Sequence, residues 1–395
     1  MRKEKIKVLL VYHSASLSAA RKIFEALAAH KEIELRVLGP RRAFNRKRNV
    51  LLEIPEPYHG KFDLVTGSVY KAMRDPTGPY LTGLLREMVQ FRPQIIHIMN
   101  EVFSRIHLQA LVYRNLFLRG AKVLFFGFEN ILDVPRSPRS RRKWDFICRN
   151  GNGGGYANTE GLERVVELGY SRDNLMVTYW GVPLNQFYPS RNEKFRRELG
   201  VHEKFVLGYV GRVVQEKGLF TLLNALKYLP ESAHCLCIGD GPELDFFIAK
   251  ARALGLENRV HWVGEIPRGD ACSYINAFDV LALPSETTPW WKEQLGRVLA
   301  EAMACGVPII GSDSGAIPET IGKAGKIFPE RDCYGLAATV RTLQENPQLC
   351  RDLGKEGMKR AKEHFSCEAF AEKLVRLYIH TLATNLLPAG DNGCS

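Results

Sequence analysis

A segment flanked by glycines carries two basic residues just after a predicted strand. Gly211 follows the apolar run 204–210, Arg212 comes next, and Lys217 lies five residues later, directly before Gly218. Glycine lets a backbone approach a ligand closely, and residues at the carboxyl ends of parallel strands face the bound ligand. Two cations beside the start of a helix would suit a diphosphate group. The alternative at this point is an ordinary charged loop.

Two carboxylates, Glu293 and Glu301, are separated by seven residues. Glu301 lies on a predicted helix over residues 294–304, whereas Glu293 lies in the preceding loop. Eight helical positions span about 12 Å, so the two carboxylates could contact opposite ends of one elongated ligand. Gly296 lies where the start of the helix would present free N–H groups. Apolar residues flank Glu301, so we expect a partly buried carboxylate that needs a partner.

The elements that must position these residues alternate between short apolar runs and helical patterns along both halves of the 395-residue chain. Such alternation predicts parallel sheets covered by helices. In the first half the expected strands are 6–12, 33–38, 94–99, 121–126 and 156–158, and the expected helices are 17–27, 81–91, 104–119 and 160–168. In the second half the expected strands are 204–210, 233–238, 259–263, 279–283, 307–311 and 326–328, and the helices are 219–228, 242–254, 294–304 and several after residue 336.

This pattern predicts an α/β fold with two Rossmann-like doubly wound domains that face a cleft. The segment 181–189 has two prolines and no periodicity, and it marks the seam. We expect one domain over 1–185, a second over 186–370, and a C-terminal helix with a loose tail over 371–395. Open parallel sheets bind ligands outside the carboxyl ends of their strands, so the cleft is the expected site.

The second half resembles the retaining glycosyltransferases of the GT-B fold, family 4, also called glycosyltransferase group 1. The Glu-x7-Glu spacing is followed by Ala302-Met-Ala-Cys-Gly306-Val-Pro308, which is similar to the signature of that family. Further similar segments are 238–243, 279–285, 311–319 and the linker 181–189. The resemblance is dense over 175–370 and covers 1–175 only in outline.

The resemblance implies a donor site for a nucleotide-diphosphate sugar. Arg212 and Lys217 would hold the diphosphate and stabilise it as it leaves, because fixed cations at that place act on the transition state. Glu293 would accept hydrogen bonds from the sugar hydroxyls, and Glu301 would bind the ribose hydroxyls. On the same resemblance the donor-binding set is completed by Gly211, Gly241, Gly296 and Arg297.

An aromatic pair, Trp290 and Trp291, precedes Glu293. In this position the pair could stack on sugar faces or wall the donor pocket. Packing under the loop is the alternative.

Neither a cofactor nor a metal is expected. Arginine and lysine replace the metal in this family, and the Asp-x-Asp motif of metal-dependent sugar transferases does not occur. Leu244 stands where a dinucleotide-binding fingerprint would need its third glycine, which argues against NAD. The nine cysteines include no C-x-x-C pair, which favours buried thiols over a zinc site.

The first half departs from the family and supplies the candidates for the acceptor side. Glu129 and Asn130 follow a predicted strand after which many members have a histidine, and Glu101 follows the neighbouring strand. These groups could bind hydroxyls, and a carboxylate could take the acceptor proton; structural loop capping is the alternative. His13 and His97 are further candidates. For His97, which lies within an apolar strand, the alternative is a histidine buried in the core.

The net charge of +12 lies entirely in the first half of the chain. An uneven field of this kind favours an anionic partner such as a membrane surface or an acidic polymer, although a merely soluble basic face is the alternative. Nucleic acid is not expected, because neither aromatic–basic interleaving nor zinc-finger spacing occurs. The basic residues form two clusters, which are Arg41, Arg42, Arg46, Lys47 and Arg48, and Arg136, Arg139, Arg141, Arg142 and Lys143.

The apolar runs are too short to cross a bilayer, and the N-terminal residues lack a signal-peptide core. We therefore expect a cytoplasmic protein that is peripheral on the inner face of the membrane. The expected function is retaining hexosyl transfer from a nucleotide-diphosphate sugar to a glycan or lipid-linked acceptor hydroxyl. Such transfer would serve polysaccharide, glycolipid or cell-envelope glycoconjugate synthesis. The alternative is a catalytically inactive GT-B protein that binds a nucleotide sugar or an anionic partner.

Overall fold

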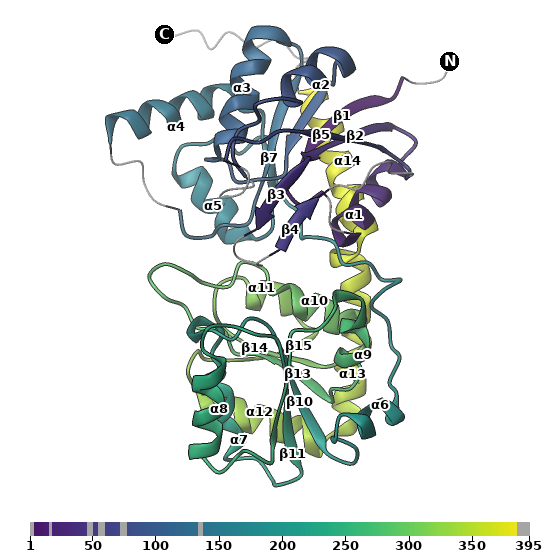
Figure 1. The fold of residues 1–395 in the computed structure, drawn as a ribbon, viewed down its shortest axis with the longest axis vertical. Helices are drawn as coiled ribbons and strands as arrows, with labels where there is room; N and C mark the ends of the chain where they lie inside the picture. The colour runs from purple at the N-terminus through teal and green to yellow at the C-terminus, as the bar shows by residue number, and fades with distance from the viewer. Residues whose placement is uncertain are drawn as a thin grey trace, which may run out of the picture. The chain divides into compact units, whose positions relative to one another are not determined.

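The computed structural model describes residues 4–15, 18–45, 50–53, 60–71, 77–132 and 137–384. The chain divides into two compact units, the first formed by Met1–Tyr179 with Cys367–Ser395 and the second by Trp180–Ser366. Each unit has its own parallel sheet packed with helices (Figure 1). The predicted α/β class with two Rossmann-like domains is therefore confirmed. Among the described residues, no helix has the length and apolar character that a membrane span requires.

The first unit holds, within its described residues, a seven-stranded sheet in the order β5-β2-β1-β6-β7-β8-β9, with every neighbouring pair parallel. Its strands are β1 (Ile6–Val11), β2 (Ile33–Pro40), β5 (Asp63–Gly67), β6 (Ile95–Ile98), β7 (Lys122–Gly127), β8 (Gly154–Tyr156) and β9 (Leu175–Val177). Its helices are α1 (Ser18–Ala28), α2 (Leu84–Phe91), α3 (Arg105–Phe117), α4 (Pro138–Asn150), α5 (Thr159–Glu167) and α14 (Cys367–Ala383). A separate antiparallel pair is formed by β3 (Arg42–Asn45) and β4 (Val50–Glu53).

The second unit holds a six-stranded parallel sheet in the order β12-β11-β10-β13-β14-β15, counted over the described residues. Its strands are β10 (Phe205–Val210), β11 (Ala233–Ile238), β12 (Val260–Gly264), β13 (Val280–Leu283), β14 (Ile309–Ser312) and β15 (Gly325–Phe328). Its α-helices are α6 (Glu193–Glu198), α7 (Leu219–Leu226), α8 (Leu244–Ala253), α9 (Ala271–Ile275), α10 (Arg297–Ala304), α11 (Ile317–Ile321), α12 (Cys333–Glu345) and α13 (Pro347–Arg360). Two short 3₁₀ helices, η1 (Gln215–Lys217) and η2 (Arg268–Asp270), and one π-helix, η3 (Ala361–Phe365), complete the unit as described.

The strands form where they do because both faces of each sheet are covered. Every residue of β11 is buried, as is every residue of β6 and β13. Strands that are buried on both faces consist of near-continuous apolar runs, and such runs occur along this sequence. In register, Val8 of β1 lies between Leu35 of β2 and Ile95 of β6.

The strand order fixes where ligands can bind. Numbered along the chain within each sheet, both orders begin 3-2-1-4-5-6, so the direction of winding reverses once in each. The reversal lies between β1 and β6 in the first sheet and between β10 and β13 in the second. Ligands of open parallel sheets bind at the carboxyl ends of the strands at this switch point.

The observed units differ from the predicted boundaries of 185 and 370 because the chain returns to its first unit. Helix α14 lies beside α1 in the first unit (Figure 1). The Tyr378 hydroxyl on α14 is 2.7 Å from His97 Nδ1 on β6, and Phe370 meets Phe126 edge to face. Residues 367–383 are thus part of the core of the first unit rather than a separate C-terminal element.

Sequence periodicity assigns no element to the basic run 136–143, yet helix α4 begins at Pro138. The Ser137 side chain accepts a hydrogen bond from the Ser140 backbone N–H, and the Ser140 side chain accepts one from the Ser137 backbone N–H, which forms a capping box. Proline at the first helical position adds to this start signal. Trp144 and Ile147 are the buried side of the helix.

Candidate functional site

The switch point of the second sheet brings together a lysine, a glutamate and a serine. Lys217 lies in the loop after β10, whereas Ser285 and Glu293 lie in the loop after β13. Glu293 Oε2 accepts hydrogen bonds from Lys217 Nζ at 2.6 Å and from Ser285 Oγ at 2.8 Å. Only 7% of Glu293 is exposed. Two predicted site residues from different loops therefore form one partly buried ion pair where the topology predicts a ligand.

The Lys217 loop has this shape because of Gly218. This residue has φ 69° and caps the start of α7. A Cβ atom at this position would lie 1.7 Å from the carbonyl oxygen of Pro284 in the loop after β13. Only glycine allows the two loops to come this close, and their contact brings Lys217 within reach of Glu293. Lys217 Nζ also lies 4.5 Å from the centre of the Trp291 ring, a cation–π contact.

Arg212 follows β10 and is exposed. Its carbonyl oxygen accepts a hydrogen bond from the Tyr209 hydroxyl at 2.7 Å, which holds the backbone at this point. In the described part of the chain its guanidinium makes no ion pair or hydrogen bond. Arg212 therefore presents an exposed cation at the same strand end as the Lys217 loop.

Glu301 lies on α10 and forms a second charged cluster. Its Oε1 accepts a hydrogen bond from Arg268 at 2.8 Å and lies 3.2 Å from Arg297 Nε. The Glu301 side chain is 8% exposed, so the expectation of a buried carboxylate with a partner is met. Arg268 belongs to η2, which follows β12, and Arg297 is four residues before Glu301 on the same helix. A carboxylate held by two arginines is fixed in place and can accept hydrogen bonds from hydroxyl groups on its remaining lone pairs.

The glycines predicted to admit a ligand are also needed for packing. A Cβ atom on Gly241 would lie 2.2 Å from the Val213 carbonyl oxygen, and one on Gly211 would lie 2.8 Å from the Tyr209 hydroxyl. Gly296 has φ 65°, which other residues adopt with strain, and it caps the start of α10. Close packing at Gly211 and Gly241 and the positive φ of Gly296 therefore account for these glycines without a ligand, and their contact with a donor stays a prediction.

The carboxyl edge of the first sheet carries Glu101 after β6. Its Oε1 accepts the backbone N–H of Phe128 at 2.7 Å and of Glu129 at 3.3 Å. This is the loop capping that the sequence left as an alternative. Its Oε2 has no exposed surface and no hydrogen-bond partner among the described residues. Since a substrate hydroxyl cannot touch Oε2 in this conformation, Glu101 positions the loop that carries Glu129 and Asn130.

The pKa of the Glu101 carboxyl is raised above its ordinary value. Burial raises its pKa, two backbone N–H groups oppose this rise, and the nearby Glu129 carboxylate adds to it, with the pKa reaching about 7. The Tyr156 hydroxyl, which is also buried without a hydrogen-bond partner within the described residues, shares this environment. A Cβ on Gly127 would lie 2.9 Å from Glu101 Oε2 and 2.7 Å from Cζ of Tyr156. Glycine at 127 is therefore needed to fit both side chains.

His97 is a core residue and not an acceptor-side group. It has no exposed surface. Its Nε2 lies 3.2 Å from the Phe125 carbonyl oxygen, and its Nδ1 lies 2.7 Å from the Tyr378 hydroxyl. Because a carbonyl only accepts, Nε2 carries the hydrogen and Nδ1 accepts from Tyr378. Burial is the main cause that lowers the pKa of His97, to about 4. The imidazole is therefore neutral and fully partnered, which rules out the predicted role.

The other acceptor-side candidates stay at the predicted edge. His13 follows β1, and its ring is 4.8 Å from the Tyr12 ring. Glu129 is exposed and Asn130 is buried. The parallel topology places His13 and Glu101 at adjacent strand ends of the first switch point, so their sharing of one edge follows from the sheet order.

The basic clusters lie partly outside the described residues, namely Arg46, Lys47, Arg48 and Arg136. Of the others, Lys143 differs from the prediction, because its Nζ donates to the Phe103 carbonyl oxygen at 2.8 Å and is half-buried. Burial, with Arg105 nearby, lowers the pKa of Lys143. The residues that remain exposed are Arg41, Arg42, Arg139, Arg141 and Arg142.

The charged clusters of the second unit lie in the part of the chain that matches a known protein family. Residues 190–360 match the family model described as "Glycosyl transferases group 1". Lys217, Glu293 and Glu301 all lie within the matched residues. The predicted family is therefore supported where the sequence resemblance was dense.

Two curated relatives are similar to the chain over about half of its length. The α-maltose-1-phosphate synthase of Mycolicibacterium smegmatis is 30% identical over 224 residues, which cover 52% of this chain and 57% of the relative. The D-inositol 3-phosphate glycosyltransferase of Corynebacterium jeikeium is 30% identical over 229 residues, which cover 54% of this chain and 52% of the relative. The chain thus spans about half the length of the curated relatives it matches.

Solved structures share the fold over almost the whole chain. Anabaena Alr3699/HepE in complex with UDP has a TM-score of 0.69 at 20% identity, covering 96% of this chain and 100% of that one. Sucrose-phosphate synthase from Thermosynechococcus elongatus has a TM-score of 0.74 at 20% identity, with the same coverage. At this identity the likeness shows the fold alone.

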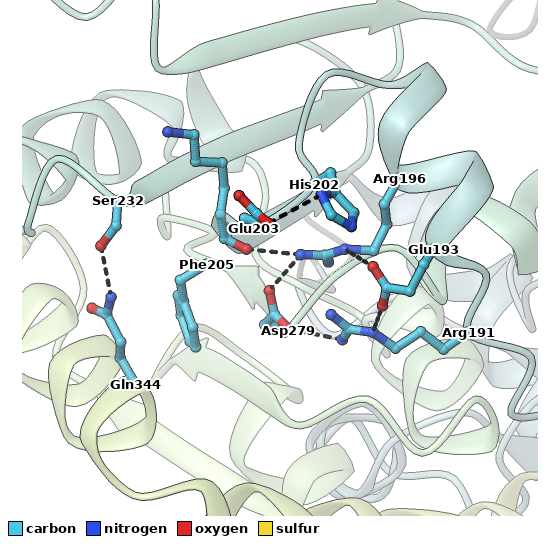
Figure 2. A pocket seen from close by; sticks show the side chains of 10 residues that line it. Arg191, Glu193, Arg196, His202, Glu203, Phe205, Ser232, Asp279 and Gln344 are labelled. Carbon is cyan, nitrogen blue, oxygen red and sulfur yellow. Dashed lines mark hydrogen bonds and ion pairs between the residues drawn. The ribbon is translucent and has the colours of Figure 1, made fainter.

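A hollow of about 390 Å³ in the second unit lies at the opposite, amino-terminal edge of its sheet, beside the starts of β10, β11 and β13. Figure 2 shows its charged groups pointing at one another. Arg196 is 2% exposed, and it donates to the carbonyl oxygens of Ala277 and Lys204 and pairs with Asp279 at 3.3 Å. Arg191 pairs with Glu193 at 2.7 Å and with Asp279. Because these charges neutralise one another, the hollow is an ion network that ties loops together.

Sequence reasoning missed three residues of these clusters. Ser285 ends a segment that was matched to the family, but a hydroxyl that supports Glu293 has no spacing signal of its own. Arg268 lies 33 residues before Glu301, and only the fold brings them together. Tyr156 was expected to be part of a short strand, and its position beside Glu101 depends on the pairing of β7 with β8.

Proposed function

We propose that the chain is a retaining glycosyltransferase of the GT-B type, family 4, that transfers a hexose from a nucleotide-diphosphate sugar to an acceptor hydroxyl. The observation that carries the proposal is the joining of Lys217, Ser285 and Glu293 at the switch point of the second sheet, within residues 190–360. The solved complexes of Alr3699/HepE with UDP and with UDP-glucose make UDP-glucose the first donor to test.

The Lys217–Glu293 pair would bind two parts of one donor. Its carboxylate accepts hydrogen bonds, as a sugar hydroxyl requires, and its ammonium and the Arg212 guanidinium favour phosphate oxygens. The pair is formed before any ligand arrives, so its geometry costs no reorganisation during the reaction. Glu301, fixed by Arg268 and Arg297, would accept the ribose hydroxyls at the other end of the donor.

The cations would act mainly as the glycosidic bond breaks. The bond between sugar C1 and the phosphate oxygen breaks, the acceptor oxygen bonds to C1 on the same face, and the acceptor proton passes to the departing phosphate. Negative charge grows on that phosphate, so Arg212 and Lys217 stabilise the transition state more than the ground state. The chain's own arginine and lysine supply this charge in the proposal, with neither a metal nor a cofactor assigned.

Measurement of UDP-glucose hydrolysis tests the proposal. We expect Lys217→Ala to lower turnover by about 10²–10³-fold, the usual loss when one preorganised charge contact is removed. Lys250→Ala is the matched control, because Lys250 lies on α8 in the same unit and contacts the Phe220 ring instead. Equal turnover of both variants and the wild type would contradict the proposal.

A second variant separates loss of chemistry from loss of folding. Removing Lys217 alone takes away the cation of the buried Glu293 carboxylate, and breaking a buried ion pair from one side destabilises proteins by about 3–5 kcal/mol. The double variant Lys217→Gln with Glu293→Gln removes both charges and should melt close to the wild type. We expect it to fold and still to lack turnover. An active double variant would show that the ion pair has only a structural role. The inactive alternative would be favoured by a different result, in which the wild type binds UDP but transfers no sugar.

The acceptor is proposed to be a glycan or a lipid-linked glycan, used in polysaccharide, glycolipid or cell-envelope glycoconjugate synthesis. Relatives named for capsular polysaccharide and teichuronic acid synthesis support this range. We propose further that the first unit binds an anionic membrane surface through the exposed arginines of α4. The neighbouring helix α3 exposes Leu116 and Phe117, and surface-bound helices combine basic and apolar groups in this way.

Vesicle co-sedimentation tests the membrane proposal. Each cation near an anionic bilayer contributes about 1 kcal/mol, so the triple variant Arg139→Glu, Arg141→Glu, Arg142→Glu should lose binding to phosphatidylserine vesicles by at least 100-fold. Reversal of two exposed cations on α13, Arg351 and Lys355, is the matched control and should have little effect. Equal binding by the triple variant and this control would contradict a docking role for α4.

A further inference from the structure

The turn before Glu293 holds one indole ring outward. Trp290 is 87% exposed, the largest value among the large hydrophobic residues that the structure describes. Thr288 Oγ1 accepts the backbone N–H of Trp290 at 3.3 Å and of Trp291 at 3.0 Å. The Thr288 N–H also donates to the Trp291 carbonyl oxygen at 2.8 Å, which closes the turn. These hydrogen bonds hold the backbone of the turn that carries the exposed Trp290 side chain.

The two neighbouring indoles have different surroundings. Trp291 is half-buried, with Lys217 Nζ 4.5 Å from its ring centre, and it belongs to the inner side of the turn with the Lys217–Glu293 pair. Trp290 makes no ring contact, hydrogen bond or ion pair through its side chain within the described ranges. The sequence left stacking on a sugar and packing under the loop as alternatives for this pair. In the structure Trp291 packs against Lys217, whereas the Trp290 side chain is exposed to solvent.

Two other exposed aromatic residues of the same unit, Tyr334 and Phe246, have ring partners. Tyr334 is 65% exposed, but its ring centre lies 4.5 Å from that of Tyr228 and their hydroxyl oxygens are 3.0 Å apart. Phe246 meets Phe247 edge to face at 5.5 Å. These residues cover part of their own unit. Trp290 differs because its flat faces are not used by the fold.

We propose that the Trp290 indole is a stacking platform for a pyranose ring of the acceptor, which makes the acceptor a glycan; the inference rests on the proposed function. One face of a pyranose presents aliphatic C–H groups while its hydroxyls point outward, so it matches an aromatic face at low entropic cost. The inner side of the turn carries the carboxylate and the ammonium proposed for the donor. The outer indole is thus left for the second substrate, three residues from Glu293.

Acceptor kinetics of the full chain test the platform. The assay uses UDP-glucose with a panel of p-nitrophenyl hexosides and disaccharides as acceptors. We expect Trp290→Ala to raise the acceptor KM about tenfold, which corresponds to about 1.4 kcal/mol, and Trp290→Phe to keep most of the affinity. The KM for UDP-glucose in the absence of acceptor should not change. Tyr334→Ala, the matched exposed aromatic, should leave both values as in the wild type.

The outcomes separate this inference from the proposed function. A wild type that neither hydrolyses nor transfers UDP-glucose or any other nucleotide sugar refutes the proposed function and the platform together. A wild type that turns over donor but saturates with no glycoside in the panel refutes the platform alone, as does an acceptor KM unchanged in Trp290→Ala. If Trp290→Ala instead weakens binding to phosphatidylserine vesicles with acceptor KM unchanged, the indole is a membrane contact and the platform is wrong.

Discussion

Replacement of Glu101 by glutamine gives a sharp test of the buried carboxyl at the edge of the first sheet. The glutamine oxygen can accept the same N–H groups of Phe128 and Glu129, while the amide takes the place of Oε2. The variant therefore keeps the loop contacts and removes only the titration. Burial is the largest cause of the raised pKa, about 7 against the ordinary 4.5.

The sign of the effect follows from proton uptake. Between pH 4.5 and 7 the folded protein holds a proton on Glu101 that the unfolded chain has already released, so the free energy of unfolding falls as pH rises through this window. A shift of this size corresponds to about 3 kcal/mol when complete. Glutamine has no such dependence. Relative to the wild type, Glu101→Gln should gain stability steadily from pH 5 to pH 7.5, by up to about 3 kcal/mol.

Hydrogen exchange of the β6 and β7 amides is the suitable assay, because a chain with two units need not unfold in one step. The ratio of protection between variant and wild type is measured at intervals from pH 5 to 7.5, after correction for the intrinsic pH dependence of exchange. Glu129→Gln is the matched control, since Glu129 is exposed and only assists the shift. Parallel profiles for Glu101→Gln and the wild type would refute a buried, proton-binding carboxyl.

Two structural substitutions give further expected outcomes. Gly218→Ala should lower the melting temperature of the second unit by many degrees, because its Cβ would lie 1.7 Å from the Pro284 carbonyl oxygen. The control is Gly255→Ala, which has nearly the same φ of 68° but open space around it and should lower the melting temperature much less. Equal losses in the two variants would contradict the clash. Tyr378→Phe should destabilise the first unit by about 1–3 kcal/mol, since it leaves the buried Nδ1 of His97 without a donor, and urea unfolding that matches the wild type would show that this hydrogen bond contributes little.

The sheets, and the loops that carry Lys217 and Glu293, could be predicted because their signals are local. Strands buried on both faces are continuous apolar runs, and Lys217, Glu293 and Glu301 follow such runs at short distances. The sequence does not show which loops from different strands come into contact. The contact of Lys217 with Glu293 depends on the adjacency of β10 and β13, which are separated by two other strands along the chain.

The errors share one cause, which is that periodicity shows the apolar face of an element and not its neighbour. Helix α14 was expected after the second domain, but its buried side includes Phe370 and Tyr378, and these meet Phe126 and His97 of the first unit. The role of His97 was open for the same reason, since its partner lies 281 residues away in the sequence. Long-range contacts of this kind decide burial and protonation, and a local pattern does not contain them.

The two sheets have the same winding, yet their switch points carry different chemistry. In the second sheet the carboxylate of Glu293 accepts hydrogen bonds from a lysine and a serine, so its geometry is set in advance. In the first sheet the carboxyl of Glu101 is enclosed with no ion pair among the described residues, and burial raises its pKa because the charged form is poorly stabilised there. Topology therefore supplies a switch-point edge twice, and among the described residues the second edge carries a pair of opposite charges, Lys217 and Glu293, in contact. The two edges therefore hold a carboxylate in different ways, the second sheet through hydrogen bonds from a lysine and a serine, and the first through burial and two backbone N–H groups.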